Sequence, residues 1–120
     1  RIYFDVHSIR LLNSETRRNL TDKNMVAPEE TEGEVVNIGL FRHYIEAYLR
    51  KRDDVSKSAT LLVRQLEATQ SGVPIELYFF IGTTDWVSYE QKTSDILEHI
   101  YAYANEFGLQ IYEGLPVANT

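Results

Sequence analysis

Residues 59–113 constrain the fold most strongly, because two apolar segments flank a Ser71-Gly72 turn and are followed by one long amphipathic segment. β-Branched and aromatic residues dominate residues 60–69 and 73–82, which predicts a β-hairpin. From Trp86 to Phe107 the apolar residues recur at a helical spacing of about 3.6. Residues 109–112 then form a short apolar segment, which predicts a closing strand.

The upstream half of the chain adds one strand and one helix. Residues 1–7 alternate apolar and polar side chains, which predicts a strand. A helix is expected to begin near Asn37, a good N-cap residue, and the apolar residues of its buried side recur at helical spacing. The order β-α-β-β-α-β predicts a ferredoxin-like α+β fold, with a four-stranded antiparallel sheet and two helices on one face. One core is expected to contain Phe4, Phe41, Ile45, Leu77, Phe79, Ile96 and Ile100.

Residues 1–120 are expected to form a single domain, because this length supports one hydrophobic core. Residues 14–34 are polar, contain an acidic segment after Pro28 and have no clear periodicity. We interpret them as a polar, partly disordered insertion between the first strand and the first helix. In the long C-terminal helix, Ser88 and Gln91 are expected to form a capping box and Gly108 to end the helix.

Composition limits the possible partners and the setting. The net charge of −6 argues against nucleic acid, whose phosphates require clustered lysine and arginine. The chain has no cysteine, which is compatible with a reducing cytoplasm. No apolar run approaches the roughly 20 residues needed to cross a bilayer. The chain opens with Arg1 inside a strand-like run and without an initiator methionine, so we interpret it as part of a longer protein.

Catalytic patterns are weak, and the sequence predicts no enzyme, no catalytic residues, no cofactor and no metal site. The three histidines, His7, His43 and His99, are predicted on a strand and two different helices. No Gly-x-Ser-x-Gly elbow, phosphate-binding glycine loop or His-x-x-x-His spacing is present. His43 and His99 are interpreted as solvated or hydrogen-bonded surface residues.

Three aromatic residues are candidates for a subunit interface. In residues 75–81 the alternation places one apolar set toward the helices and leaves Tyr78 and Phe80 on the open face of the sheet. Such aromatics are unexpected on a solitary monomer, and aromatics are enriched at interfaces. We therefore predict that Tyr78, Phe80 and Trp86 lie at a subunit boundary. Alternatively, they fold back under residues 14–34, or Trp86 only packs against the start of its helix.

Several segments resemble, in the same order, the cytoplasmic end of bacterial miniconductance channels, which belong to the small-conductance mechanosensitive (MscS-like) channel family. Residues 4–13 are similar to the family's link between its middle β domain and its terminal α/β domain. The other similar segments are NIGLFRHYIEAYLR (37–50), TLLVRQL (60–66), GVPIELYFF (72–80), DWVSYEQKTSDILEHI (85–100) and EFGLQIY (106–112).

The resemblance implies a domain on the cytoplasmic side of the bacterial inner membrane, in the wall of a hollow cage below the pore of a heptameric channel. Such a channel releases osmolytes when membrane tension rises in hypo-osmotic shock. Only missing N-terminal segments would contact the membrane. The isolated domain is expected to associate weakly or to be monomeric. The alternative function is an ACT-like regulatory domain that binds a small molecule and forms a side-by-side dimer.

Overall fold

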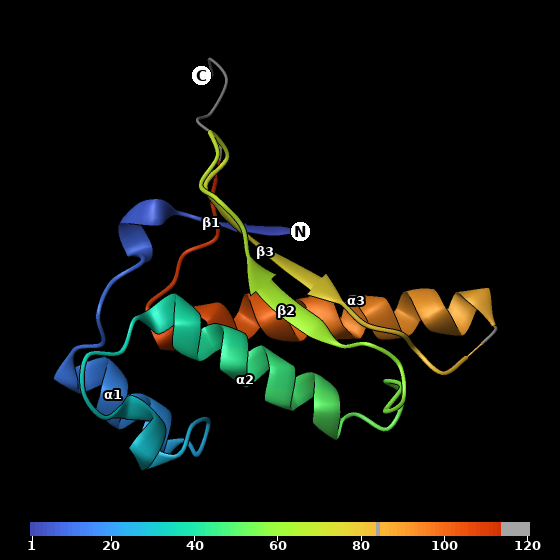
Figure 1. Cartoon of the computed structure of the whole chain (residues 1–120), viewed down its shortest axis with the longest axis horizontal. Coiled ribbons are helices and arrows are strands. Elements are labelled where there is room, and N and C mark those ends of the chain that lie inside the picture. The colour runs from blue at the N-terminus through green and yellow to red at the C-terminus, as the bar shows by residue number, and fades with distance from the viewer. Residues whose placement is uncertain (84, 114–120) are drawn as a thin grey trace.

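Figure 1 shows a computed structural model of the chain, which describes residues 1–83 and 85–113. In this part of the chain, helices and a small antiparallel sheet form one α+β domain. The elements in chain order are β1 (Ile2–Phe4), the 3₁₀ turn η1 (Val6–Ser8), α1 (Ser14–Asp22), the 3₁₀ turn η2 (Pro28–Thr31), α2 (Asn37–Lys51), β2 (Leu62–Gln65), β3 (Val73–Tyr78), α3 (Trp86–Tyr103) and the 3₁₀ turn η3 (Ala104–Phe107).

The sheet of the described residues has three strands in the order β1-β3-β2, one fewer than the four predicted. β3 is central and pairs antiparallel with both neighbours, Ile2 opposite Ile75 and Arg64 opposite Glu76. The predicted closing strand, residues 109–112, forms only an isolated antiparallel bridge between Phe4 and Ile111. Gly108, with its positive φ, turns the chain just before this segment.

The predicted hairpin is present, although its strands are shorter than the apolar segments from which they were predicted. Thr69 and Gly72 exchange two backbone hydrogen bonds of 2.8 and 3.1 Å around the turn. Gly72 adopts a positive φ of 100°, which L side chains rarely adopt. A Cβ atom at this position would lie 2.5 Å from the carbonyl oxygen of Phe4. Glycine is therefore required both by the backbone conformation and by the close approach of β1.

Gly72→Ala is expected to lower the free energy of unfolding by about 2–3 kcal/mol, because it adds backbone strain and a contact with the β1 backbone. Gly33→Ala is the matched control, since Gly33 also has a positive φ, of 77°, but has no atom within 4 Å of the added Cβ. The control is expected to lose about 1 kcal/mol. Urea denaturation of both variants measures the difference. Equal losses would contradict the role of the contact with Phe4.

Residues 14–34 are not a disordered insertion, and that interpretation is wrong. The side chain of Asn13 caps α1 by accepting a hydrogen bond of 2.8 Å from the backbone N–H of Thr16. Leu20 is fully buried in the core, and Lys23 at the end of α1 forms a 2.8 Å ion pair with Glu106. One buried leucine and one long-range ion pair therefore hold a helix whose remaining side chains are mostly polar.

The two long helices occur where the apolar periodicity predicts them, but their N-termini differ from the prediction. Asn37 is the first residue of α2 rather than its cap, and its side chain is buried. α3 begins at Trp86, so Ser88 lies inside the helix and donates a 2.7 Å hydrogen bond to the side chain of Asp85. The predicted capping box of Ser88 and Gln91 is therefore wrong. Gly108, with a φ of 74°, ends the helical segment as predicted.

One core joins the helices and the sheet, as predicted, and five of the seven predicted core residues are fully buried: Phe4, Phe41, Ile45, Ile96 and Ile100. Leu77 and Phe79 pack against this core but remain partly exposed. Leu77 lies near the end of β3, and Phe79 follows the strand. Along residues 1–83 and 85–113, every helix is too short or too polar to cross a membrane.

Candidate functional site

The end of β3 carries an exposed aromatic pair, in agreement with the predicted orientation of these side chains. Tyr78 is 51% exposed and Phe80 is 47% exposed. Their rings lie edge to face, with centroids 5.4 Å apart and planes at 89°. This geometry suits the opposite charges of ring faces and edges and holds the two rings as one unit. The chain thus presents a preformed aromatic surface rather than two independent side chains.

A groove of about 630 Å³ lies beside this aromatic pair, between the end of β3 and the first half of α3. Leu77, Phe79 and Ile81 contribute apolar side chains to it, and Tyr89 and Leu97 line it from α3. We call the groove together with Tyr78 and Phe80 the aromatic groove. Its size lies within the range of ligand and side-chain pockets, and aromatic anchors that fill such pockets dominate many protein interfaces.

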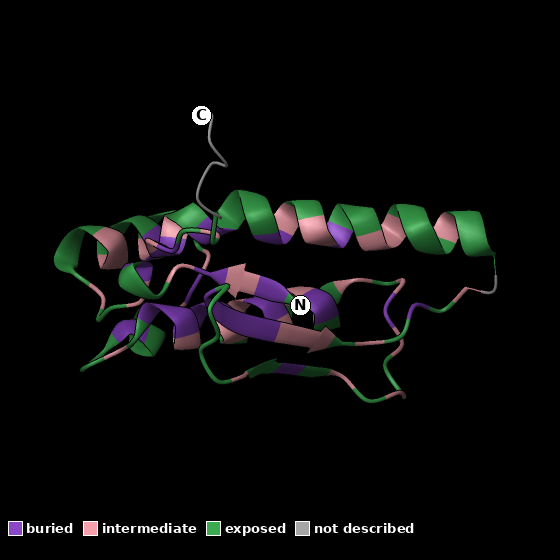
Figure 2. Ribbon diagram, turned by 90° about the horizontal axis from the view of Figure 1, so that it is seen from above, coloured by how far each residue is buried: buried purple, intermediate pink, exposed green. Residues whose placement is uncertain are grey.

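Trp86 is exposed at the start of α3, where most of the helix surface is open to solvent (Figure 2). Its side chain is 72% exposed and that of the next residue, Val87, is 57% exposed. This exposure rules out the alternative in which Trp86 packs tightly against its own helix. None of residues 14–34 lines the groove beside Tyr78 and Phe80, so the described residues give no support to the alternative in which this segment covers them. The interface role of the three aromatics stays a prediction.

Charged residues occupy the neighbouring part of the open sheet face. Glu76 accepts hydrogen bonds from Arg64 on β2, at 2.8 Å from its Nε, and from Arg1, at 3.1 Å. The hydrogen bonds from Arg64, and then those from Arg1, hold the pKa of Glu76 below its ordinary value. Tyr78 and Phe80 therefore border a charged region of this face.

A second cluster of aromatic rings lies between α2 and α3. The ring of His99 stacks on Tyr48 with a centroid distance of 3.8 Å and an angle of 4° between the ring planes. Its Nε2 atom forms a 2.8 Å hydrogen bond with the hydroxyl of Tyr44, and Tyr103 packs on it with centroids 4.4 Å apart. We call Tyr44, Tyr48, His99 and Tyr103 the tyrosine–histidine cluster.

Burial and neighbouring charges shift two pKa values in this cluster. Burial, followed by the charges of Tyr103 and Tyr48, raises the pKa of Tyr44 to about 12. Burial, followed by the positive charge of Arg52, lowers the pKa of His99 below its usual 6.5. Arg52 is held near the cluster by a 2.9 Å hydrogen bond to the hydroxyl of Tyr48 and by two bonds to Asp54, of 2.6 and 2.8 Å. The folded state therefore favours neutral His99.

The stability of the domain is expected to fall as the pH drops below about 6.5, the ordinary histidine pKa. In that window unfolded chains bind a proton at His99 while folded chains do not, so protonation favours unfolding until the lowered folded pKa is reached. Urea denaturation at pH 7.5 and 5.5 measures this loss. His99→Gln is expected to lose less stability than the original chain over this range. The control, His43→Gln at an exposed histidine, should match the original chain, and an equal loss in all three would contradict the prediction.

The remaining titratable groups do not assemble into a catalytic arrangement in the described part of the chain. His7 and Asp5 form a 3.2 Å hydrogen bond between side chains, but the imidazole of His7 is 90% exposed. His43 is exposed on α2. Along residues 1–83 and 85–113, no group of three or more histidine or carboxylate side chains is arranged to hold a metal ion.

Sequence reasoning found the aromatic pair but missed the tyrosine–histidine cluster. The sequence predicts His99 as a solvated or hydrogen-bonded surface residue; the hydrogen bond is present, but the ring is half-buried between two helices rather than at the surface. A signal was present in the sequence, since Tyr44 and Tyr48 on one helix and His99 and Tyr103 on another are each separated by four residues. It could not show that these two faces meet.

No protein-family model matches the chain. No solved structure matches it either.

Proposed function

We propose that this chain is a domain of the cytoplasmic cage wall of an MscS-like mechanosensitive channel, with a structural and oligomerisation role. The parent channel would release osmolytes when membrane tension rises in hypo-osmotic shock. The observation that carries the proposal is the aromatic groove, a preformed apolar surface that no segment within residues 1–83 and 85–113 covers. The resemblance of six sequence segments to the miniconductance channels indicates which partner that surface would have.

The partner in this proposal is a neighbouring copy of the same domain in a heptameric ring. Tyr78 and Phe80 present about half of their surface, and a groove beside them can receive a side chain of the neighbour. The charged rim of Arg64, Glu76 and Arg1 would border this apolar centre, as polar residues border most interfaces. Trp86 would extend the contact along the start of α3.

A ferredoxin-like arrangement is part of the same proposal. Its support is that residues 110–112 lie along the outer side of β1, with hydrogen bonds of 2.8 Å from Asp5 N–H to Gln110 and from Tyr112 N–H to Tyr3. If residues 110–112 are counted as a fourth strand beside β1, the strands lie in the order residues 110–112, β1, β3, β2. This is the spatial order expected for a ferredoxin-like fold. In this interpretation α1 is an additional helix in the first crossover.

The deciding experiment uses the full-length parent protein, expressed in bacterial cells that lack their own mechanosensitive channels. Membrane patches from these cells are expected to show a conductance that opens with tension. In such a channel this domain would lie on the cytoplasmic side of the inner membrane. Patches without any tension-activated conductance would overturn the proposal.

The aromatic groove is tested by Tyr78→Ser combined with Phe80→Ser in the parent. Loss of these anchors is expected to reduce the fraction of heptamer, measured by light scattering in detergent. Tyr101→Ser is the matched control, because Tyr101 is also about half exposed, at 47%, but lies outside the groove. An unchanged heptamer fraction in the double variant would show that the groove is not part of the subunit interface.

The isolated chain is expected to be monomeric or weakly associated, because the groove alone offers less contact than a stable interface of about 1,600 Å² requires. Light scattering over a range of concentrations measures this directly. A seven-subunit mass that does not depend on concentration would show that assembly needs no other part of the parent.

A further inference from the structure

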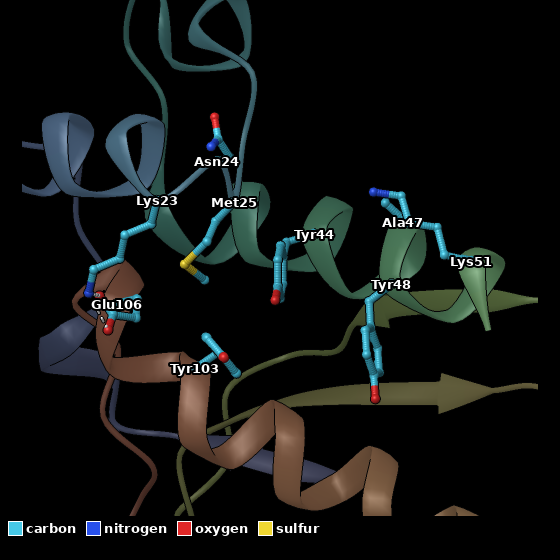
Figure 3. A pocket seen from close by; sticks show the side chains of 9 residues that line it. All are labelled: Lys23, Asn24, Met25, Tyr44, Ala47, Tyr48, Lys51, Tyr103 and Glu106. Carbon is cyan, nitrogen blue, oxygen red and sulfur yellow. Dashed lines mark hydrogen bonds and ion pairs between the residues drawn. The ribbon is translucent and has the colours of Figure 1, made fainter.

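A pocket of about 540 Å³ lies between α2, the junction of α3 with η3, and the loop after α1 (Figure 3). It is on another part of the molecule than the aromatic groove, and the two share no lining residue. A hollow of about 370 Å³ adjoins it and shares Met25, Tyr44 and Lys51. At its own size the pocket can accept a small molecule, since ligand pockets usually measure about 300–1,000 Å³. The adjoining hollow is lined in addition by Glu30, which does not line the pocket itself.

Three tyrosines and one methionine supply the apolar surface of this pocket. Tyr44 and Tyr48 extend from α2, Tyr103 extends from α3, and Met25 points between them from the loop after α1 (Figure 3). The stacked contacts of Tyr44 and Tyr48 with His99 fix the orientation of both rings. Rigid aromatic rings with a nearby thioether suit an aromatic ring as ligand, because both make favourable contacts with ring edges and faces.

The charges around the pocket leave one cation without a partner. Lys23 is neutralised by Glu106, whose two carboxylate oxygens each lie 2.8 Å from its Nζ. Arg52, next to Tyr48, is neutralised by Asp54. Lys51 lines the opposite end of the pocket and is exposed, and it forms no ion pair with any described residue. The pocket thus carries a single unpaired positive charge at one end.

The hydroxyl of Tyr48 does not belong to this end of the pocket, because it points away from the side chain of Lys51 (Figure 3). Its oxygen accepts the 2.9 Å hydrogen bond from Arg52, so its own proton is directed elsewhere. The ammonium group of Lys51 is therefore the donor that a ligand carboxylate would meet at this end of the pocket. A cationic ligand would instead face the ammonium group of Lys51, which disfavours the choline-like ligands that aromatic cages often bind.

We propose that this pocket binds a small aromatic monocarboxylate, with its ring against Tyr44 and Tyr103 and its carboxylate at Lys51. The proposal does not depend on the channel function, because none of its residues belongs to the aromatic groove. The ligand class follows from the aromatic lining, the single unpaired ammonium group and the size of the pocket.

The test is a titration of the intact chain, labelled with ¹⁵N, with 1-naphthoate as probe. Saturable chemical-shift changes are expected at Met25, Tyr44 and Tyr103. The neutral analogue 1-naphthalenemethanol is expected to bind about three- to fivefold more weakly, because it forms no ion pair with Lys51. Lys51→Gln should remove this difference between the two probes. Arg18→Gln, which removes an exposed cation of α1 outside the pocket, should leave it intact.

The aromatic contact is tested separately. Tyr103→Ala is expected to weaken both probes, whereas Tyr103→Phe should retain binding and Tyr101→Ala, on the same helix but outside the pocket, should change neither. The dispersion of the amide spectrum shows whether each variant is folded. The proposal is overturned if shifts do not saturate up to the solubility limit of naphthoate, if they occur elsewhere, or if naphthoate and its alcohol bind equally to the original chain.

Discussion

Phe41→Ala is expected to lower the free energy of unfolding by ~3–5 kcal/mol, the usual cost of removing a buried phenyl ring. Phe41 is fully buried and lies at the centre of the core. Its ring contacts Phe4 edge to face at 5.9 Å and Phe107 at 4.8 Å, so it joins α2 to β1 and to η3. The alanine variant leaves a cavity among elements that are far apart in sequence. Urea denaturation measured by circular dichroism gives the loss.

Phe80→Ala is the matched control for this substitution. It removes the same ring, but Phe80 is 47% exposed, and its ring contact is with another exposed residue, Tyr78. We expect a loss of about 1 kcal/mol or less, in line with substitutions at exposed positions. Similar losses in the two variants would contradict the core described here.

Asn37→Ala is expected to lower the free energy of unfolding by about 3 kcal/mol or more, although it removes only a small side chain. Asn37 is 1% exposed. Its Nδ2 donates hydrogen bonds to the carbonyl oxygens of Ser8, at 2.9 Å, and Phe107, at 3.0 Å, and its Oδ1 accepts one from the N–H of Arg10. Alanine would leave three backbone groups without these partners, and each buried unpaired group costs about 1–3 kcal/mol.

The control for Asn37 is Asn105→Ala, at an exposed asparagine within η3. Its loss should be within about 0.5 kcal/mol. Asn37→Asp is a more specific test, since aspartate keeps an acceptor for Arg10 but cannot donate to the two carbonyl oxygens while it is ionised. Stability equal to that of the original chain in Asn37→Asp would show that the two donated bonds contribute little.

Apolar periodicity was enough to predict most of the central fold. The spacing of Phe41, Ile45 and Leu49 predicted α2, and that of Ile96 and Ile100 predicted α3, because each helix buries one continuous apolar side. The hairpin followed from its β-branched residues and Gly72. The lengths of the strands could not be predicted from the apolar pattern, because an apolar segment can continue past the last hydrogen bond of the ladder. Phe79, for example, follows the end of β3.

Features that depend on one or two long-range contacts could not be predicted. α1 buries Leu20 deeply but has too few apolar residues for a clear periodic signal. Asn37 suggested a helix cap because local sequence favours that role, whereas its partners lie 27 to 70 residues away in the chain. At the candidate sites, alternation predicted the exposure of Tyr78, but no local pattern could bring His99 onto Tyr48 from another helix.

The pairing of β1 with residues 110–112 has a mechanical consequence. The two segments run antiparallel, so Arg1 and Glu113 lie at the same end of their ladder. A force that pulls these two residues apart would act on the hydrogen bonds one after another, in the unzipping direction, beginning with the bond from Tyr112 to Tyr3. A force applied along the two segments, in the shear direction, would instead load all of these hydrogen bonds at the same time. Under the unzipping force, residues 110–112 would therefore separate from β1 before the helices that cover the core are displaced.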